Sequence, residues 1–93
     1  MELSERYIQQ LESEGFANVY EWQDPAGTVY EAHKHRGKTV MWLTDGSIEL
    51  TVGDKIVHLE TGDRYDVPPE TKHSAKVGQS GWIAIIAEEI EED

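Results

Sequence analysis

Short turn-forming sequences recur along the chain from Phe16 onward, and they constrain the fold more than any other feature. Each one separates short runs of residues that favour strands, a spacing typical of all-β sandwiches and barrels. The turn-forming sequences are Asp24-Pro25-Ala26-Gly27, Arg36-Gly37-Lys38, Asp45-Gly46, Gly53-Asp54 and Gly78-Gln79-Ser80-Gly81. We expect strands near residues 17–23, 28–35, 39–44, 47–52, 55–59, 64–67, 72–77 and 82–87.

The beginning of the chain follows a helical pattern instead. Its apolar residues recur at helical spacing and are Leu3, Tyr7, Ile8 and Leu11. Ser4 is the expected N-cap and Gly15 the expected stop of one short amphipathic helix. We expect this helix to cover an open end or an edge of a sheet.

A chain of 93 residues is too short to divide its core, so we predict a single domain over residues 1–93. The helix lies within 1–15, a β-barrel spans 16–87 and an acidic tail follows at 88–93. Residues 83–87 are apolar without alternation, so this strand should be covered on both faces. A second sheet would cover one face, and the N-terminal helix or a partner chain the other.

The net charge of −11 and the lack of cysteine limit the partners and the chemistry. A surface this acidic repels phosphate backbones and lipid headgroups, so we expect neither nucleic acid nor a membrane as partner. Without cysteine, histidine and carboxylates are the strong metal donors that the chain offers. The sequence opens with no basic segment followed by an apolar run, and we therefore expect a cytoplasmic location.

Two of the four histidines, His33 and His35, lie one residue apart in a run expected to be extended. Because side chains alternate across a strand, both imidazoles should face the interior, about 7 Å apart. The same alternation turns Val29 and Glu31 inward and Tyr30 outward. Two imidazoles placed in this way can converge on one metal ion.

A third histidine, His73, follows a turn-rich run and shares a strand face with Ala75. Alternation also places Thr39 and Met41 inward after the preceding turn. Three imidazoles from two strand pairs can hold one divalent ion. The fourth histidine, His58, lies between two apolar residues that suit the interior, so we interpret it as outward and structural.

These residues resemble the motifs of a small single-domain cupin. The two neighbouring histidines fall in register with the family's first motif, together with Gly27 and Gly46. Gly62, Pro68 and His73 fall in register with the second motif. The resemblance implies an antiparallel jelly-roll β-barrel or two-sheet sandwich, and a divalent metal held by His33, His35 and His73 at a small-molecule pocket.

The sequence departs from the family pattern at three positions. Thr39 replaces the Glu of the first motif, while Glu70 replaces a Gly and Val77 an Asn of the second. Without the Glu, a divalent ion on three neutral imidazoles keeps its full charge and has open coordination positions, which favours anionic ligands. Iron, nickel, zinc, manganese and copper all remain candidates for that ion.

Two functions follow from the resemblance. One is a metal-dependent, oxygenase-type enzyme that acts on an anionic small substrate. The alternative is a non-catalytic module that binds or senses a small ligand and whose metal site is structural or vestigial. Whether the chain is an enzyme stays open.

Several other residues are candidates for lining the site, and plain core packing is the competing interpretation for most of them. Glu31 is either a fourth ligand, an acceptor that fixes a histidine tautomer, or a carboxylate turned to solvent. The candidates are Glu31, Thr39, Met41, Tyr65 and Ala75, with Trp82.

Outward apolar residues predict a homodimer. Trp42 falls on the face opposite Met41, and residues 83–87 are apolar on both faces. A monomer would expose this patch unless the N-terminal helix covers it.

Overall fold

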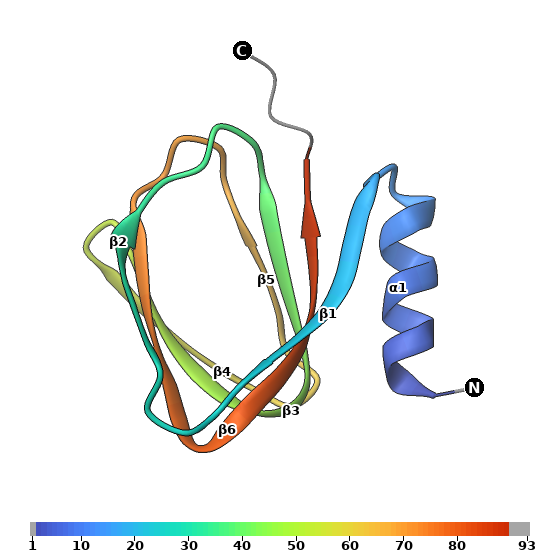
Figure 1. The fold of residues 1–93 in the computed structure, drawn as a ribbon. Helices are drawn as coiled ribbons and strands as arrows, with labels where there is room; N and C mark the ends of the chain where they lie inside the picture. Colours follow the sequence, from blue (N-terminus) through green and yellow to red (C-terminus); the bar gives the residue numbers. More distant parts are fainter. Residues whose placement is uncertain (1, 90–93) are drawn as a thin grey trace.

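The computed structural model describes residues 2–89, which form one helix and six strands (Figure 1). Helix α1 spans Leu3–Ser13, and the strand pairings that follow it are all antiparallel. The strands are β1 (Asn18–Asp24), β2 (Val29–His33), β3 (Thr39–Val52), β4 (Lys55–Glu60), β5 (Arg64–Val67) and β6 (His73–Glu88). The predicted fold, an all-β jelly-roll sandwich with one short N-terminal helix, is confirmed.

The two long strands, β3 and β6, pair with each other, and each of the other described strands pairs with one of them. The first half of β3 pairs with β5 and the second half with β4. The first half of β6 pairs with β2 and the second half with β1. The chain thereby forms one continuous six-stranded sheet whose two halves, the two sheets of the sandwich, share β3 and β6 and curve around a common interior (Figure 1).

Two of the predicted turns do not end a strand. The predicted strands 39–44 and 47–52 are one strand, β3, and 72–77 and 82–87 are one strand, β6. At Asp45 and Gly46 the register of β3 against β6 shifts, and Gly46 has a φ of 81°. A Cβ on Gly46 would overlap the carbonyl oxygen of Gly81. Glycine thus permits a close crossing that bends both strands from one sheet into the other.

The interior between the sheets is the main core. Leu43 and Leu50 of β3 are fully buried there, and Ile48 nearly so. Met41 and Leu43 lie inside while Val40 and Trp42 pack on the other face of the strand, so the predicted alternation of β3 is confirmed. The predicted outward position of His58 is also confirmed, because its side chain is exposed.

A second, smaller core lies outside the sheet, under α1. Leu11 of the helix is fully buried against Val40 of β3 and against Ile85 and Ala87 of β6. Tyr7 stacks on Trp42 with ring centroids 3.8 Å apart. The helix therefore covers a sheet face rather than an open end or an edge. The helix covers Ile85 and Ala87 on this face, and Ala84 and Ile86 pack into the interior on the other. The prediction that residues 83–87 are covered on both faces is therefore confirmed.

The ends of α1 explain one correct and one wrong prediction. Gly15 has a φ of 100° and donates its N–H to Glu12, while Phe16 donates to Leu11, so glycine ends the helix as expected. The N-cap is Glu2 instead of Ser4, without a side-chain capping bond. No helix among residues 2–89 is long and apolar enough to cross a membrane.

Candidate metal centre

Three imidazoles meet at one end of the sandwich interior. His33 closes β2 and lies directly opposite His73, the first residue of β6. His35 follows β2 in the loop, and its carbonyl accepts the N–H of Glu70 at 2.8 Å. Ring centroids lie 4.4 Å apart for His33 and His73, 4.9 Å for His33 and His35, and 5.5 Å for His35 and His73.

Strand alternation is interrupted before the two neighbouring histidines, and His35 lies beyond the end of β2. The register of β2 against β6 shifts between Tyr30 and His33, so one extra residue is accommodated there. The shift lets Tyr30 and His33 face the same interior, although they are an odd number of positions apart. The predictions that Tyr30 points outward and Val29 inward are therefore wrong, since Tyr30 lines the interior and Val29 is 63% exposed.

Backbone carbonyls fix the tautomers of two histidines. His33 Nδ1 lies 2.7 Å from the carbonyl oxygen of Glu31, and His73 Nδ1 lies 3.1 Å from that of Thr71. A carbonyl can only accept, so both Nδ1 atoms carry a proton, and Nε2 is the atom that each neutral imidazole offers to a metal. Burial lowers the pKa of His73, and the other two imidazoles lower it further, which favours the neutral form that a metal requires.

The three side chains are close enough to share one ion. Their candidate ligand atoms all lie within 4.8 Å of one another. His73 is buried, His35 is half-buried and His33 is exposed, so the cluster reaches from the interior to the surface. Imidazole donors suit a divalent transition metal, because such ions prefer nitrogen ligands of this kind.

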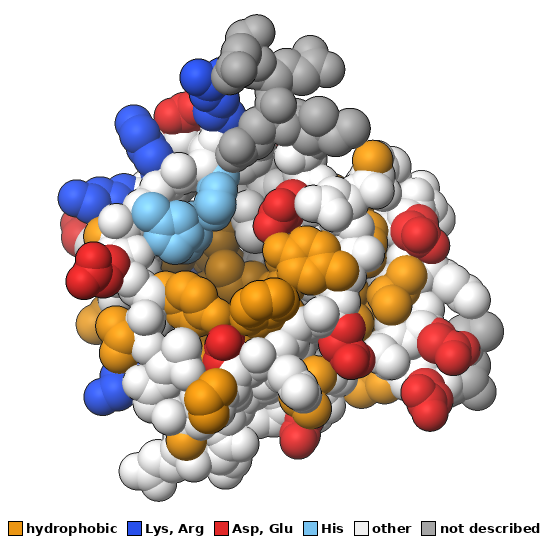
Figure 2. All heavy atoms as spheres, viewed as in Figure 1, with side chains coloured by type: hydrophobic (Ala, Val, Ile, Leu, Met, Phe, Trp, Pro, Cys, Tyr) orange, Lys and Arg blue, Asp and Glu red, His pale blue; other side chains and the backbone are white. Residues whose placement is uncertain are grey.

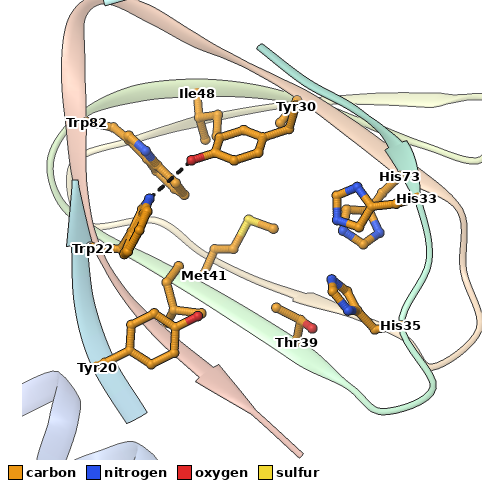
Figure 3. A pocket seen from close by; sticks show the side chains of 12 residues that line it. Tyr20, Trp22, Tyr30, His33, His35, Thr39, Met41, Ile48, His73 and Trp82 are labelled. Atoms are coloured by element: carbon orange, nitrogen blue, oxygen red, sulfur yellow. Dashed lines mark hydrogen bonds between the residues drawn. The ribbon is translucent and has the colours of Figure 1, made fainter. Parts of the chain in front are cut away.

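The histidines form one side of a cavity of about 250 Å³. Figure 2 shows the hollow on the surface, with the pale blue histidines at its rim and hydrophobic side chains across it. Figure 3 shows the cavity from close by, with the imidazoles on one side and the aromatic side chains of Tyr20, Trp22, Tyr30 and Trp82 on the other. The lining residues are Tyr20, Trp22, Tyr30, His33, His35, Thr39, Met41, Ile48, His73, Ala75, Trp82 and Ile86.

A single carboxylate holds three of these aromatic residues together. Asp24 Oδ2 accepts the indole N–H of Trp82 at 2.8 Å and that of Trp22 at 3.1 Å. It also accepts the hydroxyl proton of Tyr30, whose oxygen in turn lies 3.1 Å from Trp22 Nε1. Burial and Asp24 raise the pKa of Tyr30, so this phenol remains a donor at neutral pH.

A second carboxylate lies beside Thr39, the residue that stands at the position of the family's Glu. Glu88 is the direct partner of Thr39 across β3 and β6. Its oxygens accept from the Tyr20 hydroxyl at 2.6 Å and from the Asn18 amide at 3.2 Å. Burial raises the pKa of Tyr20, and Glu88 raises it further. Glu88 also belongs to β6, within the segment that the sequence predicts as tail, and residues 90–93 of that segment lie outside the described residues.

The structure brings most of the predicted site residues together. The three histidines line the cavity with Thr39, Met41, Ala75 and Trp82. Tyr65 packs against the inner core and is not among the lining residues. The side chain of Glu31 is exposed, and only its carbonyl serves the site, by fixing the tautomer of His33.

Apart from Trp82, sequence reasoning missed the aromatic side of the cavity. Tyr20, Trp22 and Asp24 are spaced two residues apart on β1, so strand alternation places all three on one face. That pattern is visible in the sequence and predicts their common orientation. Their convergence with Tyr30 and Trp82 is a tertiary feature, because it depends on how β1, β2 and β6 come together.

Comparisons with solved structures agree with this architecture. An RmlC-like cupin from Shewanella frigidimarina is 28% identical with a TM-score of 0.69, over 81% of this chain and 68% of that one. The Cnp3 cupin domain of Schizosaccharomyces pombe is 17% identical with a TM-score of 0.73, over 78% and 55%. A conserved protein with a double-stranded β-helix domain from Klebsiella pneumoniae is 24% identical with a TM-score of 0.68, over 76% and 64%.

Sequence comparison gives the family. A search of curated proteins finds no significant match. The family model for the cupin domain matches residues 20–81, which contain the three histidines, most of β1, strands β2 to β5 and the first half of β6. The chain therefore belongs to the cupin-domain family.

Proposed function

We propose that the protein binds one divalent transition metal through His33, His35 and His73, and that the metal faces a pocket for a small molecule. One observation carries this proposal: the ligand atoms of all three side chains lie within 4.8 Å of one another in the wall of a cavity. Two of the imidazoles also have their Nδ1 protons engaged by carbonyls, which leaves Nε2 as the donor.

The remaining surroundings support an anionic ligand at the metal. Thr39 is 7% exposed and lines the cavity where the family pattern has a carboxylate, so it adds no negative charge beside the ion. Glu88, its partner across the strand pair, is not among the residues that line the cavity. Three neutral imidazoles leave an ion with open positions and its full charge. A metal in this place would act as a Lewis acid for a carboxylate or thiolate group of the ligand.

We propose oxygenase-type chemistry on an anionic small substrate as the enzymatic function. In this function the chain's residues bind and orient the substrate: the histidines hold the ion, and the apolar wall around Met41 and Ile86 limits the access of water. The alternative, a binding or sensing module, has the same pocket without turnover. Oxygen consumption that depends on substrate and stops with a chelator supports the enzyme, and ligand binding without turnover supports the module.

Metal content of the protein, purified without a histidine tag, tests the metal site itself. We expect about one equivalent in the wild type and a sharp loss in His35→Ala, because two imidazoles hold a divalent ion poorly. His58→Ala is the matched control, since His58 is exposed on β4 and outside the cluster, and it should keep its metal. Full occupancy in His35→Ala would rule out the assignment.

A cytoplasmic location remains part of the proposal. The acidic surface gives no basis for attachment to anionic lipid or to nucleic acid. Fractionation of cells that express the protein from its own promoter checks the location.

A further inference from the structure

We propose that the aromatic side of the cavity binds a compact alkylated cation, such as a trimethylammonium group. The ligand would then be a small zwitterion whose anionic end meets the metal. The first part of this inference is independent of the metal, and the second part rests on the proposed function.

The aromatic side presents rings instead of polar groups. Tyr20, Trp22, Tyr30 and Trp82 line the cavity, and Tyr20 and Trp22 meet edge to face with centroids 6.4 Å apart. The polar edges of the other three are engaged with Asp24. A ligand on this side therefore meets mainly carbon and π-electron surface, which attracts cations.

Asp24 places a negative charge directly behind this wall. Its three donors are two indoles and a phenol, none of which is a cation, so none of them pairs with the carboxylate as a counter-ion. Asp24 itself is not among the lining residues, so a ligand is separated from it by the rings. A carboxylate behind aromatic faces strengthens the attraction for a cation in a partly dry site.

The wall also favours an alkylated cation over one that carries N–H groups. Met41, Ile48 and Ile86 complete the lining near the rings and offer no strong acceptors. An N–H donor placed there would lose its hydrogen bonds to water, whereas a methylated nitrogen has none to lose.

The dimensions indicate a small ligand with two unlike ends. The cavity of about 250 Å³ is below the range of drug-sized pockets. The rings and the imidazoles lie on opposite sides of it (Figure 3). One compact molecule can therefore contact both sides at once, with its cation at the rings and its anion toward the histidines.

Two probes of the same shape test this inference. Trimethylammonioacetate carries a cationic head, and 3,3-dimethylbutanoate replaces the nitrogen with carbon. Each is titrated into the metal-free and the metal-loaded full-length protein, followed by the indole N–H resonances in NMR. We expect the zwitterion to bind more tightly, by on the order of tenfold, in both forms. The resonances of Trp22 and Trp82 should shift, whereas that of Trp42, stacked on Tyr7 outside the sheet, should not.

Three variants separate the contributions. Asp24→Asn keeps an acceptor for the indoles but removes the charge. The ratio of the two probes' affinities, which favours the zwitterion in the wild type, should therefore fall toward one. Trp22→Leu should weaken binding of the zwitterion without changing metal content. Ile56→Ala is the control, because Ile56 is 68% exposed and outside the cavity, and it should change neither. Thermal melts establish that each variant is folded.

The outcomes for the rings and for the metal are distinct. Metal should tighten both probes, because both carry a carboxylate. If it tightens neither while the preference persists, the proposed function is wrong and the cation site stands. If the neutral-headed probe binds wild type as tightly as the zwitterion, or the resonances of Trp22 and Trp82 do not respond, the cation site is overturned.

Discussion

At the scale of single residues, Glu70 shows why the family pattern has glycine at its position. Glu70 has a φ of 57°, and among residues 2–89 it is the only residue other than glycine with a positive φ. Its N–H donates to the carbonyl of His35, so this strained residue helps to hold the backbone of a candidate ligand. A Cβ is unfavourable in this conformation.

We expect Glu70→Gly to be more stable than Glu70→Ala by about 1 kcal/mol in urea unfolding, because glycine adopts this φ without strain. Both variants lose the ion pair to Lys34 at 3.6 Å, so that loss cancels in the comparison. At a residue with ordinary φ the order would be reversed. Alanine equal to or better than glycine would mean that the loop relaxes and that Glu70 is not strained in solution.

Thr39 offers a direct test of the charge at the site. Thr39→Glu would bury a carboxylate opposite Glu88, and like charges across a strand pair repel. The metal-free variant should melt below the metal-free wild type, and metal should raise its melting temperature by more. Anionic ligands should bind the metal-loaded variant more weakly. Equal metal stabilisation and unchanged anion affinity would show that this side chain does not face the ion.

The residues of the site were partly predictable. The spacing of the three histidines and the inward alternation of Thr39 and Met41 come from the sequence, and the structure agrees with both. The orientation of Tyr30 could not be predicted from the sequence, because a single extra residue in β2 reverses the alternation and leaves no clear signal in composition. The composition around Asp24 predicts a turn, although Asp24 closes β1 and organises the aromatic wall.

At the scale of elements, Arg64 of β5 fixes α1 to the sheet. Its guanidinium donates to both oxygens of Glu14 at 2.8 Å and to Asp66 at 2.8 Å. It also lies 5.1 Å from the ring centroid of Trp42, on which Tyr7 stacks. Hydrogen bonds from Arg64, and then from Gln10, lower the pKa of Glu14 to about 2.

This ion pair predicts how the helix responds to acid. Because the pKa of Glu14 is lowered in the folded state, its contribution to stability is present above its ordinary pKa of 4.5 and is lost as the pH falls toward about 2. Glu14→Gln should therefore lower the melting temperature at neutral pH and make little difference near pH 2. Glu12→Gln, at an exposed carboxylate of the same helix, is the control. A difference between wild type and Glu14→Gln that is constant with pH would contradict this account.

The elements were easier to predict than their continuity. Helix α1 and the strand segments follow from periodicity, whereas Asp45-Gly46 has the composition of a hairpin turn and yet bends a continuous strand. The difference lies in the partner strand, since β6 continues alongside and Gly81 approaches Gly46 closely. Local composition cannot distinguish a chain that reverses from one that bends against a neighbour.

At the scale of the whole molecule, helix α1 covers the apolar face from which the sequence predicts a homodimer. Trp42, Ile85 and Ala87 pack under α1, so this face needs no partner chain. Among residues 2–89, the large apolar side chains that are exposed are Leu3, Trp22, Val29 and Ile56. A homodimer remains a prediction and would have to use another surface. Light scattering at high micromolar concentration checks it, and a monomer mass under those conditions would contradict it.

The shared long strands give the molecule an uneven resistance to local opening. Amides in the pairing of β3 with β6 should exchange with solvent only through global unfolding, whereas those of β4 and β5 can exchange through fraying of one edge. His33 lies on the edge strand β2 and His73 on β6, so a bound ion would join an edge to this slow-exchanging pair. Hydrogen exchange should then slow in β2 on addition of metal, while β4 keeps its rate. Loss or gain of the ion would in this way change backbone mobility only locally, at the mouth of the cavity, and would leave the cooperative pairing of β3 with β6 intact.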